Sequence, residues 1–198
     1  MSSGFGNILK NFLSLFYHYK TARLYDYTLF GAHGQTVENL SRIFQGHLPG
    51  TLTEEGKKQA MDLGESLRNI ALDAVVSSDL QRVVDTVQLA VGDRQLPWQQ
   101  TTLLREIDWG PWTGLPVGSV DLSNPPAGVE TRQMMYDRAG AFLDYLWQHY
   151  DGKRVLVVAH GQINRCLEAR ITGVPLEELR TVPLMKNAEL HRYELTRE

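Results

Sequence analysis

Two histidines occur in the same short motif at distant points of the chain. His33 and His160 each stand in the tetrapeptide Ala-His-Gly-Gln, close behind an apolar run of the composition typical of a buried strand. In an open α/β sheet, ligands bind in the crevice outside the carboxyl ends of the parallel strands. Either histidine alone is explained equally well as a turn or core residue, but the repetition predicts two imidazoles that face one pocket.

An arginine and a glutamate lie in comparable positions. Arg82 falls in the first turn of a helix predicted from Leu80, shortly after the apolar run at residues 72–76. Donors at a strand-to-helix junction bind anions readily, so Arg82 is a candidate anion ligand. Glu106 follows a strand predicted at residues 101–104. A solvated arginine and a surface carboxylate are the commoner structural explanations for such residues.

These four side chains suit phosphoryl transfer through a histidine. A neutral imidazole can attack phosphorus and form a phosphohistidine, which divides one difficult displacement into two easier ones. The phosphoryl oxygens need planar cationic donors, which arginine supplies, and the leaving alkoxide needs a proton from a carboxylic acid. With His33 as nucleophile, His160 and Arg82 as oxygen ligands and Glu106 as acid, every role is filled.

Other chemistries lack their motifs. A zinc site is the first alternative, but the chain has no His-Glu-x-x-His and no closely spaced pair of histidines. The Gly-x4-Gly-Lys-Ser/Thr phosphate loop and the Gly-x-Ser-x-Gly nucleophile elbow are also absent from the sequence. We therefore expect a reaction that uses no metal and no other cofactor.

Length, charge and cysteine content limit the remaining classes. The chain has 198 residues, a net charge of −3 and one cysteine, Cys166. The length suits one domain, and the charge offers no overall attraction to nucleic acid or to an anionic membrane, so any anion site must be local. A single cysteine excludes an internal disulfide framework, and a reducing compartment such as the cytoplasm is expected.

Apolar runs and amphipathic stretches alternate along the chain. This order predicts an α/β fold with a mainly parallel sheet and helices on both faces. A single domain is expected over residues 25–198, with a short flap at about 108–130 where Gly, Pro, Ser and Asn are frequent. The expected strands are residues 27–30, 72–76, 101–104, 155–158 and 189–196, and the expected helices begin near residues 53, 80, 131 and 162.

Residues 1–24 are predicted to form an amphipathic helical extension. Apolar residues recur at helical spacing over residues 3–20, with polar residues opposite. The stretch is too short and too polar to span a bilayer, and it lacks the features of a secretory signal. Packing on its own domain, on a partner or at a membrane interface all remain open.

Four ordered segments resemble the histidine phosphatase superfamily, in the branch that contains cofactor-dependent phosphoglycerate mutases and small broad-specificity phosphatases. The segments stand in the family's order and at about its spacing, and they cover nearly the whole chain from Tyr27 onward. The resemblance implies a three-layer, phosphoglycerate mutase-like sandwich and metal-independent chemistry. The segments are LFGAHGQTVENLSRIFQGHLPGTLTEEGKKQA, DAVVSSDLQRVVDT, LLREIDWGPWTG and VLVVAHGQINR.

The resemblance also implies roles for particular residues. His33 would be the phosphorylated nucleophile, Arg82 and His160 would bind the phosphate, and Glu106 would donate the proton. The substrate pocket would be formed by Gly34, Gln35, Thr36, Asn39, Arg42, Gly161 and Gln162.

One residue departs from the family pattern. The family signature begins Arg-His-Gly, and its arginine binds phosphate, whereas this chain has Ala32. Losing such a donor costs about 10²–10³ in rate. Ala32 is either an introduced change, a natural residue with compensation by Arg42, Arg105 or Arg165, or the sign of a member that binds phosphorylated ligands without turning them over.

The length of the predicted flap bears on the type of reaction. Mutases of this family carry longer insertions that keep water from the phosphoenzyme, whereas residues 115–130 form only a modest stretch. The sequence therefore predicts a phosphatase of small phosphate monoesters, with a mutase or a non-catalytic regulatory protein as alternatives. Sugar phosphates, phosphoglycerates, a nucleotide-loop phosphate of the cobalamin pathway and phosphorylated proteins are candidate substrates. An oligomer is possible.

Overall fold

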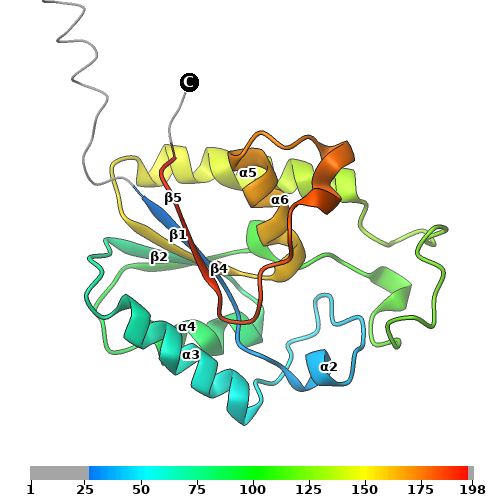
Figure 1. Ribbon diagram of the computed structural model, residues 1–198, viewed down its shortest axis with the longest axis horizontal. Coiled ribbons are helices and arrows are strands. Elements are labelled where there is room, and N and C mark those ends of the chain that lie inside the picture. The colour runs from blue at the N-terminus through cyan, green and yellow to red at the C-terminus, as the bar shows by residue number, and fades with distance from the viewer. Residues whose placement is uncertain (1–26, 196–198) are drawn as a thin grey trace, which may run out of the picture.

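The computed structural model describes residues 27–195. The helical extension predicted over residues 1–24 lies outside the described residues. Within them the chain forms one five-stranded sheet in the order β3-β2-β4-β1-β5 (Figure 1). The parallel strands are β1 (Thr28–Ala32), β2 (Ala74–Ser78), β3 (Trp98–Thr101) and β4 (Val155–Ala159), and β5 (Leu190–Tyr193) pairs antiparallel with β1 at one edge. The mainly parallel α/β sheet predicted from the sequence is confirmed.

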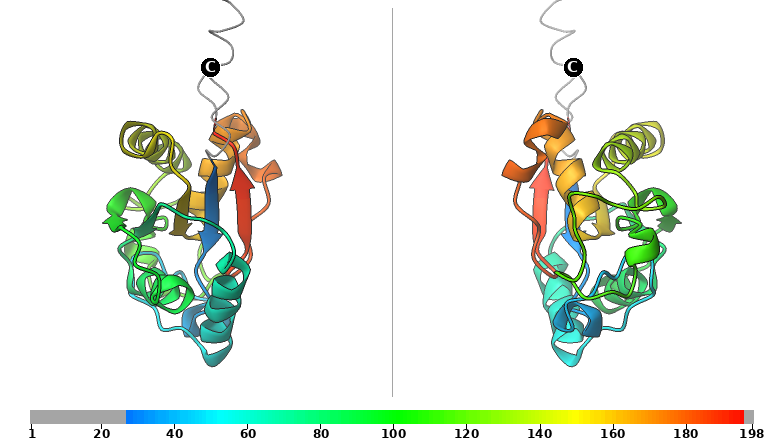
Figure 2. Two further views of the ribbon diagram at one scale, coloured as in Figure 1. Left: turned by 90° about the vertical axis from the view of Figure 1, so that its left-hand side faces the viewer. Right: turned by 90° about the vertical axis from the view of Figure 1, so that its right-hand side faces the viewer.

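Helices cover both faces of this sheet. The helices α5 (Arg132–Tyr150) and α6 (Gly161–Ile171) pack on one face, and α3 (Glu54–Leu67) and α4 (Gln81–Val91) pack on the other (Figures 1 and 2). Every residue of β1, β2 and β4 is buried. Burial on both faces explains why these strands are continuous apolar runs.

Neighbouring residues of each central strand point into different cores. In β1, Phe30 joins the core under α5 and α6, whereas Leu29 joins the core under α3 and α4. In β4, Val157 and Leu156 divide in the same way. Each strand must therefore keep the same side chains in each core and cannot turn about its own axis. The residues that follow its carboxyl end are held in defined directions as a result.

The prediction of a strand at residues 101–104 is wrong. Strand β3 is Trp98–Thr101, and Thr102–Leu104 is a 3₁₀ turn, η1. β3 lies at an edge of the sheet and is partly exposed, so it needs no apolar run. Leu104 is fully buried in the core under α5 and α6, which gives the turn its strand-like composition. Short apolar runs are ambiguous in this way.

The segment between η2 (Gly110–Trp112) and α5 contains no helix or strand. It is joined to residues 42–44, because Phe44 N donates to Leu115 O at 2.9 Å and Val117 N donates to Arg42 O at 2.7 Å. Residues 42–44 follow the short helix α2 (Val37–Leu40), which the sequence did not predict. A further 3₁₀ helix, η3 (Leu176–Thr181), precedes β5.

Candidate active site

The two histidines lie side by side at the carboxyl ends of β1 and β4. These strands are adjacent, with Ala32 opposite Ala159, so the residues that follow them meet at one edge. The ring centroids of His33 and His160 are 5.2 Å apart, with an angle of 64° between the planes. His33 N also donates to Ala159 O at 3.2 Å, which ties the two strand ends together. The predicted convergence of the imidazoles is therefore present.

The two ring nitrogens of His33 have different partners. Its Nδ1 lies 2.7 Å from Gly34 O, and because a carbonyl only accepts, the neutral ring carries its proton on Nδ1. Burial, aided by the charge of Arg82, lowers the pKa of His33 to about 3. His33 is therefore neutral near pH 7, and its Nε2 holds the lone pair that a nucleophile needs.

The guanidinium of Arg82 is fixed beside that lone pair. Arg82 lies in the first turn of α4 and is 1% exposed. Its Nη1 donates to Leu48 O at 2.6 Å and its Nη2 to Gly46 O at 3.0 Å, while Nε approaches His33 Nε2 at 3.3 Å. Burial lowers the pKa of Arg82 to about 10, which leaves it charged at neutral pH. The Nε–H of Arg82 therefore points to His33 Nε2, the atom to which a phosphoryl group would be attached.

His160 is completely buried and has one unused ring nitrogen. Its Nε2 lies 2.9 Å from Ser78 Oγ at the end of β2. Its Nδ1 has no hydrogen-bond partner among the described residues. Burial, aided by Arg82, lowers the pKa of His160 well below its usual value. When Ser78 donates to Nε2, the proton of the neutral ring is on Nδ1, which is then a free donor.

Glu106 lies against the first turn of α6, which His160 precedes. Its Oε1 accepts from Ile107 N at 2.9 Å, and its Oε2 accepts from Gln162 N at 3.2 Å in the first turn of α6. Loss of hydration raises the pKa of Glu106, although these two hydrogen bonds act in the opposite direction. A carboxyl with a raised pKa can hold a proton and give it to a leaving group.

An ion pair that the sequence did not reveal supports the Glu106 loop. Arg138 Nη1 donates to Arg105 O at 2.7 Å and to Leu103 O at 3.0 Å. The same guanidinium binds both carboxylate oxygens of Glu130, whose Oε2 also accepts from Asp108 N at 3.0 Å. Arg138 lies in the middle of α5, where an arginine carries no local signal of such a role.

A loop before β5 holds the backbone of His33. Asn187 Nδ2 donates to His33 O at 3.2 Å, and Ala188 N donates to the same oxygen at 3.1 Å. Asn187 Nδ2 also approaches Asn39 Oδ1 at 3.4 Å. Nothing in the local sequence indicates these contacts, since they join residues far apart in the chain.

Three residues predicted to line the pocket make structural contacts. Thr36 Oγ1 and Asn39 Oδ1 accept from each other's backbone N–H at the start of α2 and form a capping box. Gln35 Oε1 accepts from Thr53 Oγ1 at 3.0 Å, at the start of α3. Contacts between these side chains and a substrate remain a prediction.

Two glycines of the predicted pocket lie against backbone or carboxylate atoms. A Cβ at Gly34 would lie 2.3 Å from Gly56 O, so only glycine fits there. Gly161 begins α6, and a Cβ there would lie 3.9 Å from Glu106 Oε2.

The arginines considered as replacements for a guanidinium at Ala32 differ in their availability. Arg105 binds Asp79 with two hydrogen bonds of 2.8 and 2.5 Å and is therefore occupied. Arg42 is exposed and has a φ of 52°. Arg165 is partly buried, and its Nε has no hydrogen-bond partner among the described residues. Of the three, only Arg165 combines burial with an unused donor.

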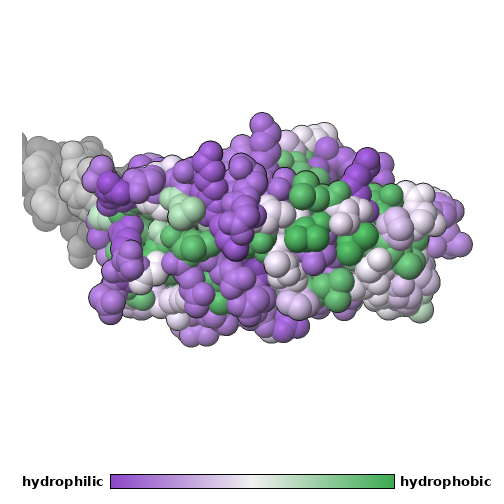
Figure 3. Space-filling model, turned by 90° about the horizontal axis from the view of Figure 1, so that it is seen from below, coloured by the Kyte–Doolittle hydropathy of each residue, from purple (hydrophilic) through white to green (hydrophobic). Residues whose placement is uncertain are grey.

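The surface around the site is partly apolar. Figure 3 shows the side of the molecule on which α2 lies, where apolar patches alternate with hydrophilic residues. Exposed apolar residues of α2 and of the segment before α5 are Val37, Leu40, Leu115, Val117 and Leu122.

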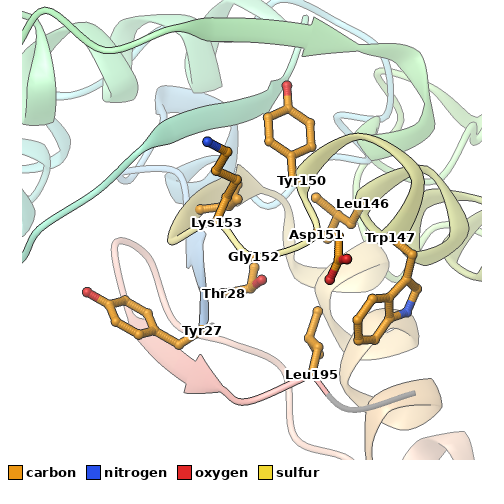
Figure 4. Close-up of a pocket in the computed structure, with 10 residues that line it drawn as sticks. Tyr27, Thr28, Leu146, Trp147, Tyr150, Asp151, Gly152, Lys153 and Leu195 are labelled. Atoms are coloured by element: carbon orange, nitrogen blue, oxygen red, sulfur yellow. The ribbon is translucent and has the colours of Figure 1, made fainter. Parts of the chain in front are cut away.

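A separate hollow lies at the opposite end of the sheet. It has an open volume of about 340 Å³ and is lined by residues at the amino ends of β1 and β4, including Thr28 and Val155, together with Tyr150 and Lys153 (Figure 4). It contains none of the predicted site residues.

Over residues 27–195, no group of three or more His, Cys, Asp or Glu could hold a metal ion. Within the same range, no helix is long and apolar enough to cross a membrane.

Curated relatives of the chain are phosphatases and mutase-like proteins. The chain is 32% identical over 163 residues to the adenosylcobalamin/alpha-ribazole phosphatase of Escherichia coli K12, covering 74% of this chain and 79% of that protein. It is 33% identical over 177 residues to the glucosyl-3-phosphoglycerate phosphatase of Mycolicibacterium vanbaalenii, covering 79% and 78%. A probable phosphoglycerate mutase of Salmonella choleraesuis is 30% identical over 158 residues.

Solved structures share the same fold. The alpha-ribazole phosphatase of Shigella flexneri superposes with a TM-score of 0.78 at 25% identity, covering 84% of this chain and 89% of that chain. The mycobacterial glucosyl-3-phosphoglycerate phosphatase in complex with VO3 gives 0.76 at 28% identity, covering 84% and 91%. The phosphoglycerate mutase-like fold expected from the sequence is confirmed. The profile of the superfamily matches residues 30–198, and the chain therefore belongs to branch 1 of the histidine phosphatase superfamily.

Proposed function

We propose that this protein is a metal-independent phosphatase that hydrolyses small phosphate monoesters through a phosphohistidine on His33. The observation that supports this most strongly is the contact of 3.3 Å between Arg82 Nε and His33 Nε2. It places a cationic donor beside the only lone pair of a neutral imidazole. A phosphate that approached Nε2 would meet this donor at once.

The first half-reaction forms the phosphoenzyme. His33 Nε2 attacks phosphorus, the ester P–O bond breaks, and its electron pair leaves on the alcohol oxygen, which takes the proton of Glu106. Arg82 and the Nδ1–H of His160 bind the phosphoryl oxygens while charge builds on them.

The second half-reaction returns the enzyme to its starting state. Water attacks the phosphohistidine, and the Glu106 carboxylate takes a proton from that water. The N–P bond breaks, its electron pair returns to His33 Nε2, and inorganic phosphate leaves. Glu106 is then protonated for the next cycle.

Ala32 reduces this activity in our proposal. Ala32 is 3% exposed and contributes no donor, whereas the family signature has arginine there. Because Arg105 is bound to Asp79, it is not available to supply the missing donor. A rate below that of family members with the arginine, by about 10²–10³, follows from the lost charge.

Hydrolysis is favoured over mutase activity because the segment between η2 and α5 is short and has no helix to close over the site. The curated phosphatases named above support the same choice.

Cys166 is buried and unpaired, which suits a reducing compartment, and we place the activity in the cytoplasm.

The proposal is tested by phosphate release from 4-nitrophenyl phosphate, with and without EDTA. We expect activity that survives chelation and is lost in His33→Ala. His149→Ala, which alters an exposed histidine at the end of α5, is the matched control and should retain activity. Loss of activity with EDTA, or full activity in His33→Ala, would contradict the mechanism. With 3-phosphoglycerate as substrate, formation of its isomer in place of free phosphate would identify a mutase.

A further inference from the structure

Three buried polar atoms at the start of α6 lack hydrogen-bond partners. They are His160 Nδ1, Asn164 Oδ1 and Arg165 Nε, and among the described residues no other buried side-chain nitrogen or oxygen is in this state. His160 has a role in the proposed mechanism, and Asn164 uses its Nδ2 to bind Gly31 O at 3.0 Å. Arg165 makes no hydrogen bond or ion pair within residues 27–195 and has no assigned role.

The position of Arg165 on α6 directs its side chain toward Glu106. It lies three residues after Gln162, whose N–H binds Glu106 Oε2, and four residues after Gly161. Residues at these spacings share one face of a helix, and a helical side chain leans toward the preceding turn. An added Cβ at Gly161 would contact Leu184 Cδ2 at 3.5 Å and Glu106 Oε2 at 3.9 Å, so Glu106 lies close against the first turn of α6. Arg165 lies on the same face of α6 as Gly161, and its side chain therefore leans toward Glu106.

The charge of Arg165 is not balanced when the site is ready to react. Glu106 is a carboxyl whose charge raises the pKa of Arg165, but it must be protonated, and so uncharged, in order to act as an acid. Burial lowers the pKa of Arg165, and the neighbouring Arg132 at the start of α5 lowers it further. A second anion beside Glu106 would relieve this unpaired charge.

The leaving alcohol must lie beside Glu106, because this residue protonates it. We propose that Arg165 is a substrate-binding residue that selects phosphate monoesters whose alcohol part carries a second anionic group, a carboxylate or another phosphate. This inference rests on the proposed phosphatase function. It assigns Arg165 to the leaving group, so this residue does not replace the phosphate ligand that is missing at Ala32.

The test compares two esters that differ at one carbon. In 3-phosphoglycerate that carbon is a carboxylate, and in glycerol 3-phosphate it is a hydroxymethyl group. We expect kcat/KM of the wild type to be higher for 3-phosphoglycerate by about tenfold or more. Arg165→Met should lower it for 3-phosphoglycerate by about 10-fold to 100-fold, as for loss of a hydrogen bond between charged groups, and change it less than about twofold for glycerol 3-phosphate.

Two further variants make the result specific. Arg165→Lys keeps the charge and should retain part of the preference, and Arg180→Met alters an exposed arginine of η3 and should leave both rates unchanged. Equal losses on both esters in Arg165→Met, or no preference in the wild type, would overturn the assignment.

Failure of the phosphatase proposal can be distinguished from failure of the role assigned to Arg165. If the wild type hydrolyses neither these esters nor 4-nitrophenyl phosphate, the proposed function is wrong, and calorimetric binding of both esters to the protein then decides the role of Arg165. Tighter binding of 3-phosphoglycerate that disappears in Arg165→Met supports the inference, whereas equal affinities of the two esters refute it.

Discussion

Removal of the Arg138 guanidinium should damage proton donation by Glu106 more than the other steps of catalysis. Arg138 binds the carbonyl oxygens of Leu103 and Arg105 and both carboxylate oxygens of Glu130. These contacts fix the loop that carries Glu106. In Arg138→Met all of them are lost, while the length and apolar character of the side chain are kept.

The structure sets the expected loss of stability and the expected loss of rate in Arg138→Met. The side chains of Arg138 and Glu130 are 17% and 11% exposed, so loss of the pair costs up to about 3–5 kcal/mol of stability. A domain whose stability lies in the middle of the usual range of about 5–15 kcal/mol stays folded at 25 °C after such a loss. A catalytic group displaced by about 1 Å loses about 10² in rate. The rate loss should therefore be visible in folded protein.

Substrates with different leaving groups separate proton donation from other effects. Ethyl phosphate releases an alkoxide that needs a proton, whereas 4-nitrophenyl phosphate releases a stable anion that does not. We expect kcat of Arg138→Met to fall by about 10² on ethyl phosphate and by less than about fivefold on 4-nitrophenyl phosphate. Steady-state kinetics at pH 6 and 25 °C, with the folded fraction checked by circular dichroism, measure both values.

A matched variant controls for loss of an ion pair as such. Arg154 binds Asp73 with two side-chain hydrogen bonds of 2.9 and 2.8 Å, at the start of β4 and away from the histidines. Arg154→Met should lower both rates by the same factor or leave both unchanged. If Arg138→Met also lowers both rates equally, Arg138 does not act through Glu106 and the reasoning fails.

Three other changes test separate parts of the site. Ala32→Arg should raise kcat/KM for 4-nitrophenyl phosphate by about tenfold or more, because it adds a phosphate-binding cation, and an unchanged value would show that another group already fills the role. The wild-type kcat on ethyl phosphate should fall as pH rises past the raised pKa of Glu106, since only the protonated acid can donate, and Glu106→Gln should abolish this dependence on pH. The free energy of unfolding should fall as pH is lowered from about 6.5 toward about 3, because the unfolded imidazole of His33 binds a proton that the folded one, with its pKa of about 3, rejects. Urea denaturation at several pH values measures this slope, which His33→Gln should reduce; the same slope in the variant would show that His33 is not its source.

The sequence by itself determined the fold class and the meeting of the two histidines. Apolar runs that end in Ala-His-Gly-Gln become buried parallel strands, and parallel strands present their carboxyl ends at one edge of a sheet. These are local patterns with a fixed geometric consequence. The helix start at Thr53 follows from a local pattern as well, because a cap depends on residues only three positions away.

Only the tertiary structure decided how the site is held and which charges are free. The lone pair of His33 faces the site because Gly34 O takes the other ring nitrogen, and Arg82 is fixed by the carbonyls of Gly46 and Leu48. Whether Arg105 is occupied or Arg165 is free depends on partners such as Asp79, 26 positions away in the chain. Such contacts leave no periodic mark on the sequence, because they arise from the packing of separate elements and not from the conformation of any one of them.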